Sequence, residues 1–76
     1  MKELLMAIVE GLVEEPSAVE ITVTEDDSGA TVFHLHVAEH DMGRVIGKQG
    51  RIAKAIRTVM RAAAIRTGTK IMVEID

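Results

Sequence analysis

A pair of glycines encloses one basic and one polar residue in the stretch Val45-Ile46-Gly47-Lys48-Gln49-Gly50. Tight turns of this kind often require a positive φ angle, and glycine has no Cβ that would hold a ligand away from the backbone. Amide groups in such a turn, and at the start of a helix that follows it, can face an anion. We therefore interpret residues 47–50 as a loop that binds a phosphate backbone.

The charge distribution supports this interpretation. Residues 43–70 contain eight Lys or Arg residues and no Asp or Glu. Residues 1–42 contain ten acids and one lysine, a net charge of −9, whereas residues 43–76 contain eight basic and two acidic residues, a net charge of +6. Such asymmetry indicates binding to a polyanion, although the two halves could instead mainly neutralise each other in the fold.

Length and composition restrict the class of protein. The 76 residues are predicted to form a single domain, 1–76, and cores of this size are commonly supplemented by oligomerisation. Without cysteine the chain can form neither disulfides nor zinc–thiolate sites. The longest apolar run, residues 4–9, is too short to cross a bilayer, and the N-terminus lacks the features of a secretory signal. We expect a soluble cytoplasmic protein without membrane contact.

Hydropathy patterns predict the elements of the first half. Apolar residues at helical spacing indicate a helix over residues 2–15, which Pro16 ends. Alternating apolar and polar residues predict two strands, about 19–24 and 33–37, joined by a turn at 26–29. The side chains expected to face the core are Val19, Ile21, Val23, Phe33, Leu35 and Val37, with His34 and His36 pointing outward.

The second half predicts two helices and a last strand. Asp41 is a plausible N-cap for a short helix over 42–46, which Gly47 ends. A longer helix from Gly50 to about Thr67 follows, with Gly68 as its C-cap, and then a strand over 71–75. The core stripe expected for this long helix is Ile52, Ile56, Val59 and Ala63, and the opposite side of the helix has Lys54, Arg57 and Arg61. The order αββααβ predicts an α+β fold with three strands covered on one face by three helices.

At this point the chain resembles a KH domain of the type II arrangement. The glycine loop between two helices in the αββααβ order carries the likeness. The string Asp41-Met42-Gly43-Arg44-Val45-Ile46-Gly47-Lys48-Gln49-Gly50-Arg51-Ile52-Ala53-Lys54-Ala55-Ile56-Arg57 is similar to the signature of the KhpA family, small bacterial single-KH RNA-binding proteins. The resemblance covers essentially the whole chain and implies a type II KH fold with a mixed sheet.

The resemblance also implies a binding site. In KH domains the Gly-x-x-Gly loop clamps the backbone of about four unpaired nucleotides. Carried over residue by residue, Gly47 and Gly50 would allow close approach of the strand, and Lys48 and Gln49 would face phosphates. Ile46 and Ile52 would form apolar groove floor, and the neighbouring phosphates would be neutralised by Arg44, Arg51 and Lys54.

The scarcity of aromatic residues fits this class of RNA-binding domain. Phe33 is the single aromatic residue, and its position in the alternating pattern predicts that it lies in the core. RNA-recognition motifs and many OB-folds need exposed aromatic side chains on which bases stack, and this chain cannot build such a surface.

Other chemistries are less well supported. A nucleotide P-loop needs four residues between its glycines and a Ser or Thr after the lysine, but three residues separate Gly43 from Gly47 and Gln49 follows Lys48. His34, His36 and His40 do not define a tetrahedral metal site. The basic segment contains no carboxylate that could act as a general acid or base. We expect no catalysis, no metal, no cofactor and no small-molecule substrate.

The predicted partner is single-stranded RNA, and the resemblance implies the role of a bacterial RNA chaperone or post-transcriptional regulator. Apolar residues outside the predicted core, including Ile65, Met6, Val9 and Val13, favour a dimer whose interface includes the long helix. The resemblance implies self-association and pairing with a larger KH-containing partner of the KhpB (Jag-like) type. Two alternatives stay open: a dimerisation module in which the partner binds the RNA, and binding of single-stranded DNA, because recognition of the 2′-hydroxyl depends on groove geometry.

Overall fold

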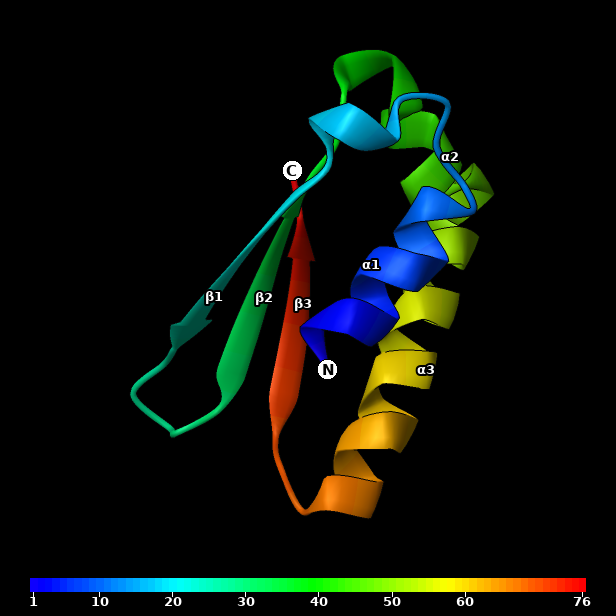
Figure 1. Cartoon of the computed structure of the whole chain (residues 1–76). Coiled ribbons are helices and arrows are strands. Elements are labelled where there is room, and N and C mark those ends of the chain that lie inside the picture. The colour runs from blue at the N-terminus through cyan, green and yellow to red at the C-terminus, as the bar shows by residue number, and fades with distance from the viewer.

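A three-stranded mixed sheet forms one layer of the fold and the helices form the other (Figure 1). The computed structural model describes all residues, 1–76. The elements follow the predicted αββααβ order: α1 (Lys2–Glu10), β1 (Glu20–Glu25), β2 (Thr31–His36), α2 (Met42–Ile46), α3 (Arg51–Thr67) and β3 (Ile71–Ile75). Three short 3-10 turns complete the chain: η1 (Pro16–Ala18), η2 (Glu39–Asp41) and η3 (Lys48–Gly50).

The strand order is β1-β2-β3, so β1 and β3 are the two edges of the sheet. β1 and β2 are antiparallel, with Val23 opposite Phe33, and β2 and β3 are parallel, with Phe33 opposite Val73. In the hairpin turn, Oδ1 of Asp26 accepts hydrogen bonds from the amide groups of Ser28 and Ala30. Parallel neighbours need a long crossover connection, which α2, η3 and α3 provide here.

The core lies between the sheet and the helices that cover one of its faces (Figure 1). Phe33 is buried there, as the alternating pattern predicts. Val23 is 46% exposed, contrary to the prediction, because β1 is an edge strand in which Ile21 alone is buried. The core cluster comprises Leu5, Val9, Val19, Ile21, Phe33, Leu35, Val37, Val45, Ile56, Met60 and Val73.

The first helix is shorter than the sequence predicts. α1 ends at Glu10 rather than at residue 15. Gly11 follows it, and glycine costs about 1 kcal/mol relative to alanine inside a helix. The amide groups of Glu14 and Glu15 donate to the carboxylate of Asp41 instead of extending the helix. A contact between distant parts of the chain therefore holds residues 14 and 15, which were predicted to be helical, outside the helix.

The buried stripe of α3 also differs from the prediction. Of the four residues expected in the core, Ile56 is buried, Ile52 and Ala63 are half-buried, and Val59 is 47% exposed. The buried residues of α3 are instead Ala53, Ile56, Met60 and Ala64. Ala53, Ile56, Met60 and Ala64 share the helix face that packs on the core, and Val59 lies instead in the groove beside α1. No helix of the chain is both long enough and apolar enough to span a membrane.

Candidate nucleic-acid interface

The glycine loop is an exposed bend between α2 and α3. Gly47 ends α2 with a φ of 74° and a ψ of 175°, a region essentially restricted to glycine. Gln49 and Gly50 are left-handed, with φ angles of 57° and 74°. The side chains of Lys48 and Gln49 are exposed at the tip. The bend is therefore open to solvent, as a loop that binds a polynucleotide backbone must be.

The two glycines have different surroundings. A Cβ atom built on Gly50 would meet no atom within 4 Å, so this side of the loop faces open space. At Gly47 the corresponding position is filled by the side chain of Ile52. Gly50 can thus give a ligand access to the backbone, whereas Gly47 is required by packing inside the protein.

Three of the predicted phosphate-binding cations are available to a ligand. Lys48, Arg51 and Lys54 are exposed, and none of them forms an ion pair with an acid of the chain. Because their charges are not neutralised internally, they surround the loop with positive potential. The acidic first half of the chain therefore does not cancel the charge of these three side chains by direct contact.

Arg44 differs from the other predicted cations because it is engaged within the protein. Its Nη2 lies 3.1 Å from Oε1 of Glu14, and its Nη1 lies 3.7 Å from Oδ1 of Asp41. The guanidinium of Arg44 thus links the start of α2 to the segment that follows α1. A phosphate could reach this guanidinium only by sharing it with two carboxylates.

Asp41 stands at the N-cap position of α2, but its side chain does not cap that helix. The fully buried carboxylate accepts hydrogen bonds from the amide groups of Glu14, at 3.0 Å, and Glu15, at 3.1 Å. Burial, the largest single effect, would raise the pKa of Asp41. The two amide hydrogen bonds, together with the charges of His40 and Arg44, outweigh it and lower the pKa below its ordinary value. Asp41 therefore holds the 14–15 segment against the base of α2.

Ile46 and Ile52, the two residues predicted to form the groove floor, are half-buried and pack against the core. Ile52 also lines an apolar groove between α1 and α3, together with Arg51 and Val59. Ile52 and Arg51 therefore lie on the α1 side of the loop. Lys54 does not line this groove; Gly50, Lys54 and Arg57 follow one another at the i, i+4, i+7 spacing of a single helical stripe.

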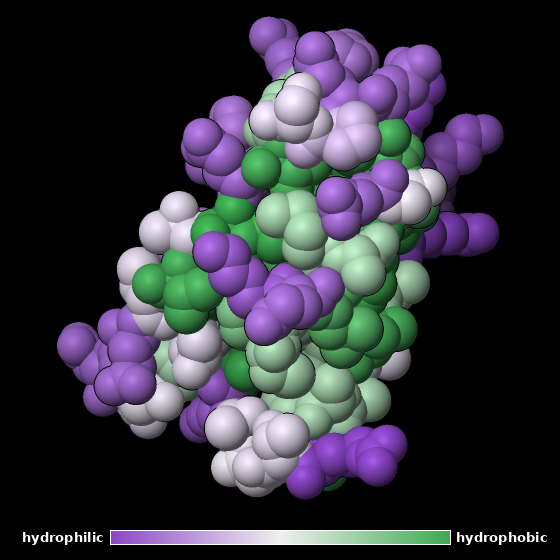
Figure 2. Space-filling view, viewed as in Figure 1, coloured by the Kyte–Doolittle hydropathy of each residue, from purple (hydrophilic) through white to green (hydrophobic).

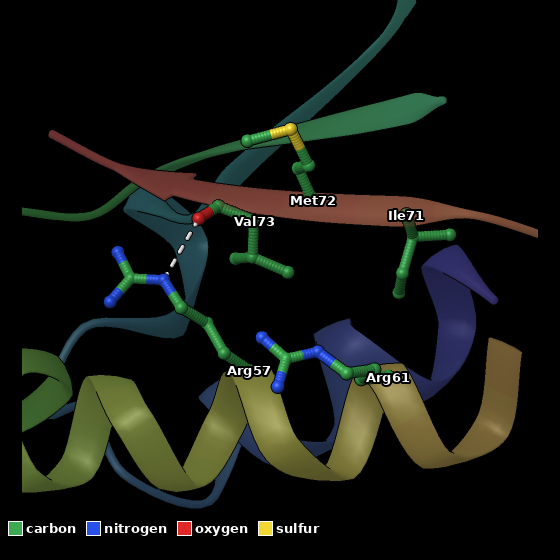
Figure 3. Close-up of a pocket in the computed structure, with 5 residues that line it drawn as sticks. All are labelled: Arg57, Arg61, Ile71, Met72 and Val73. Carbon is green, nitrogen blue, oxygen red and sulfur yellow. Dashed lines mark hydrogen bonds between the residues drawn. The ribbon is translucent and has the colours of Figure 1, made fainter. Parts of the chain in front are cut away.

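A second cleft, on the β3 side of α3, was not predicted as part of the site. Arg57 and Arg61 project from α3 toward β3, where the side chains of Ile71 and Val73 point back toward the helix and that of Met72 points to the other side of the strand (Figure 3). Nε of Arg57 donates a hydrogen bond to the main-chain oxygen of Val73 at 3.1 Å. The sequence contained the signal, because both arginines continue the helical stripe that starts at Gly50. It could not show that β3 lies opposite that stripe.

A family model described as "KhpA/KhpB, KH domain" matches residues 2–75. The chain belongs to this family. RNA-binding protein KhpA of Listeria monocytogenes is 52% identical over 75 residues, which cover 99% of this chain and 97% of the relative. KhpA of Clostridium acetobutylicum is 51% identical over 76 residues, covering 99% of each. KhpA of Borreliella burgdorferi is 40% identical over 73 residues, covering 96% and 88%. The KhpA resemblance is therefore confirmed.

Solved structures confirm the fold. Aquifex aeolicus Era bound to GDP·AlF4⁻ matches with a TM-score of 0.63 and 21% identity, covering 96% of this chain and 28% of the Era chain. Era in complex with MgGDPNP and a fragment of 16S ribosomal RNA matches equally well. Together with the strand order, this likeness establishes the predicted type II KH fold with a mixed three-stranded sheet.

One cluster of possible metal ligands lies beside α2. Ligand atoms of Glu14, His40 and Asp41 all lie within 4.8 Å of one another. The guanidinium of Arg44 contacts two of the three, and both oxygens of Asp41 accept amide hydrogen bonds. The positive charge of Arg44 therefore already pairs with the two carboxylates of this cluster.

Proposed function

We propose that this chain is a non-enzymatic protein that binds single-stranded RNA, with the backbone of the RNA held on the loop from Gly47 to Gly50. The observation that carries the proposal is the exposed loop tip, surrounded by Lys48, Arg51 and Lys54 without internal acidic partners. The KhpA relatives are named as RNA-binding proteins. The net charge of residues 43–76 is positive, which is the sign that a polyanionic partner requires.

The mechanism is electrostatic and geometric. The first turn of α3 begins at the loop, and the amide group of Arg51 there already donates to the carbonyl oxygen of Lys48. The other first-turn amide groups lack α-helical carbonyl partners. They can donate to phosphate oxygens, while Lys48 and Lys54 release counterions from the strand. Gln49 offers a neutral side-chain amide at the same tip. A single domain of this kind binds weakly, on the order of 10⁻⁴–10⁻⁶ M, because most of its affinity is not sequence-specific.

The test replaces the tip of the loop. The double variant Lys48→Asp/Gln49→Asp should weaken binding to a labelled RNA octamer at least about tenfold and reduce the salt dependence. The control variant Lys2→Asp/Ser17→Asp also lowers the net charge by three but leaves the loop intact. Unchanged affinity of a folded loop variant would reject the clamp. A DNA octamer of the same sequence, run in parallel, distinguishes RNA from single-stranded DNA.

Self-association is the second part of the proposal. An apolar groove of about 400 Å³ runs between α1 and α3, where Leu4 and Val59 are 38% and 47% exposed. Figure 2 shows apolar side chains gathered over this region of the surface. A second copy, or a KH domain of a KhpB-type partner, would cover these side chains. The sequence analysis counted Val9 among the apolar residues that favour a dimer interface. Val9 is fully buried in the core and cannot contribute to one.

Dimerisation would serve RNA binding by avidity. Two weak clamps on one dimer can engage the same strand, and the second binding event then occurs at a high effective concentration. Such a dimer would act as an RNA chaperone or post-transcriptional regulator. The rival possibility is a pure dimerisation module. It requires that the loop variant and the parent chain have the same affinity for RNA.

A further inference from the structure

The free edge of β3 presents alternate backbone groups to the cleft beside α3. The amide of Thr31 donates to the carbonyl of Lys70, and the amide of Asp76 donates to the carbonyl of Leu35. Even-numbered residues of β3 therefore bond to β2. The N–H and C=O groups of the odd-numbered residues, including Val73, point away from β2 toward the cleft.

Arg57 binds one of the acceptors on this edge, the carbonyl oxygen of Val73. Its Nε lies 3.1 Å from the oxygen of Val73, and Arg57 lines the cleft while it remains exposed to solvent (Figure 3). An arginine has five N–H donors, so four remain after this bond. Arg61 lines the same cleft one helical turn further along. Around Val73 the cleft is thus rich in hydrogen-bond donors, and the outward carbonyl of Val73 already accepts a hydrogen bond from Arg57.

The cleft is continuous with the glycine loop along one stripe of α3. Gly50, Lys54, Arg57 and Arg61 are spaced by four, three and four residues, so they share a helix face. Arg57 lies seven residues beyond Gly50, about 10 Å along the helix axis. A strand clamped at the loop and following this stripe would place its unpaired bases against Arg57 and the β3 edge.

We propose that Arg57 makes this cleft select bases that present oxygen acceptors, uracil and guanine, over cytosine and adenine. Uracil and guanine offer carbonyl oxygens, whereas cytosine and adenine offer an exocyclic amino donor at the equivalent position. An amino group placed beside Val73 meets the guanidinium donors of Arg57 and a carbonyl oxygen that Arg57 already uses. The inference rests on the proposed RNA-binding function and specifies the RNA as rich in uracil or guanine.

Edge protection is the competing explanation for the contact between Arg57 and Val73. Charged side chains on edge strands prevent unwanted strand pairing, and this role would leave base preference untouched. The two explanations differ in one measurable quantity, the ratio of affinities for two oligonucleotides that differ only in the base. Uracil and cytosine provide the cleanest comparison because both are pyrimidines, so their stacking contributes least to the difference.

The experiment measures fluorescence anisotropy with labelled U8 and C8 RNA at one salt concentration. The parent chain should bind U8 about five- to tenfold more tightly than C8, and Arg57→Ala should bring the ratio to within about twofold. Arg66→Ala removes one charge from another face of α3 and should preserve the ratio. Thermal unfolding by circular dichroism verifies that both variants are folded.

Two outcomes would overturn the inference. One is equal binding of U8 and C8 by the parent chain, and the other is a preference for U8 that survives in Arg57→Ala. Neither outcome affects the proposed function, because that is tested separately by the Lys48→Asp/Gln49→Asp variant. If that loop variant binds U8 as tightly as the parent chain, the proposed clamp fails whatever the base ratio is.

Discussion

Ile52 fills the space that a side chain at Gly47 would occupy, since its Cγ1 lies 2.6 Å from the position of a Cβ atom there. This contact joins the last residue of the α2 turn to the first turn of α3. The loop is therefore shaped from inside by an apolar side chain. The two glycines, which the sequence presents as equivalent, have different physical roles.

The first prediction follows from this asymmetry. Gly47→Ala combines a backbone conformation essentially restricted to glycine with a steric conflict, and should lower the free energy of unfolding by about 2–4 kcal/mol. Gly50→Ala, left-handed but with open space around it, should cost about 1–2 kcal/mol. Urea denaturation measures both. In a double-mutant cycle, Ile52→Ala should recover about 1 kcal/mol of the Gly47→Ala loss, and strict additivity would contradict the proposed contact.

The second prediction concerns Asp41 and acid stability. Its pKa is lowered in the folded state from an ordinary value of 3.8, so the unfolded state binds the proton more tightly. The stability that the carboxylate contributes is therefore fully present above that ordinary value and is lost as the pH falls through the folded-state pKa. Asp41→Asn should lower the midpoint of thermal unfolding by about 5 °C or more at neutral pH. It should also make the free energy of unfolding depend less steeply on pH in the acid range.

Urea titrations between about pH 2 and pH 6 check this expectation. Asp27→Asn is the matched control because Asp27 is an exposed acid in the hairpin turn. An Asp41→Asn profile parallel to that of the parent chain would show that the buried carboxylate does not govern acid unfolding.

The third prediction separates the two exposed faces of α3. Val59 lies in the apolar groove with α1, whereas Ile65, 73% exposed, lies beside Arg61 on the β3 side. Val59→Lys should weaken the proposed dimer at least about tenfold, because a charge would be buried in an apolar interface. Ile65→Lys should leave the mass unchanged. Light scattering over a concentration series measures both variants, and the reverse pattern would move the interface to the β3 side.

The fourth prediction ranks the cations around the loop. Lys54→Ala should reduce the slope of log affinity against log salt by about 0.7, the value for one phosphate contact on a single strand. Arg44→Ala should reduce it less, because the guanidinium of Arg44 already contacts Glu14 and Asp41. Salt titrations of RNA binding between about 50 and 200 mM give both slopes. A larger effect at Arg44 would mean that RNA displaces its internal partners.

Local chemistry made much of the fold predictable. Gly68 ends α3 with a φ of 71°, and Gly47 ends α2, both at the expected residues. The alternation around Phe33 placed that residue in the core correctly. Signals of this kind act within one turn or one strand, where the conformational preferences of a few residues outweigh the rest of the chain.

Contacts between distant residues account for the errors. Residues 14 and 15, which were predicted to be helical, are held outside α1 by hydrogen bonds from Glu14 and Glu15 to Asp41, 27 and 26 residues away. On α3, Met60 is buried on the helix face that packs on the core, and Val59 lies instead in the groove beside α1. Helical periodicity shows which residues share a face of the helix, but it does not show which face packs against the sheet.

The sequence by itself determined the order of elements, the glycine loop with its basic surroundings and the family. Each of these is encoded by neighbouring residues whose backbone preferences and charges act locally. The tertiary structure alone decided that Arg44 is held by Glu14 while Lys48 and Lys54 are not, and that Arg57 reaches Val73 across the cleft. Those pairings depend on the distance between elements that are far apart in the chain, which only the packing of helices on the sheet sets.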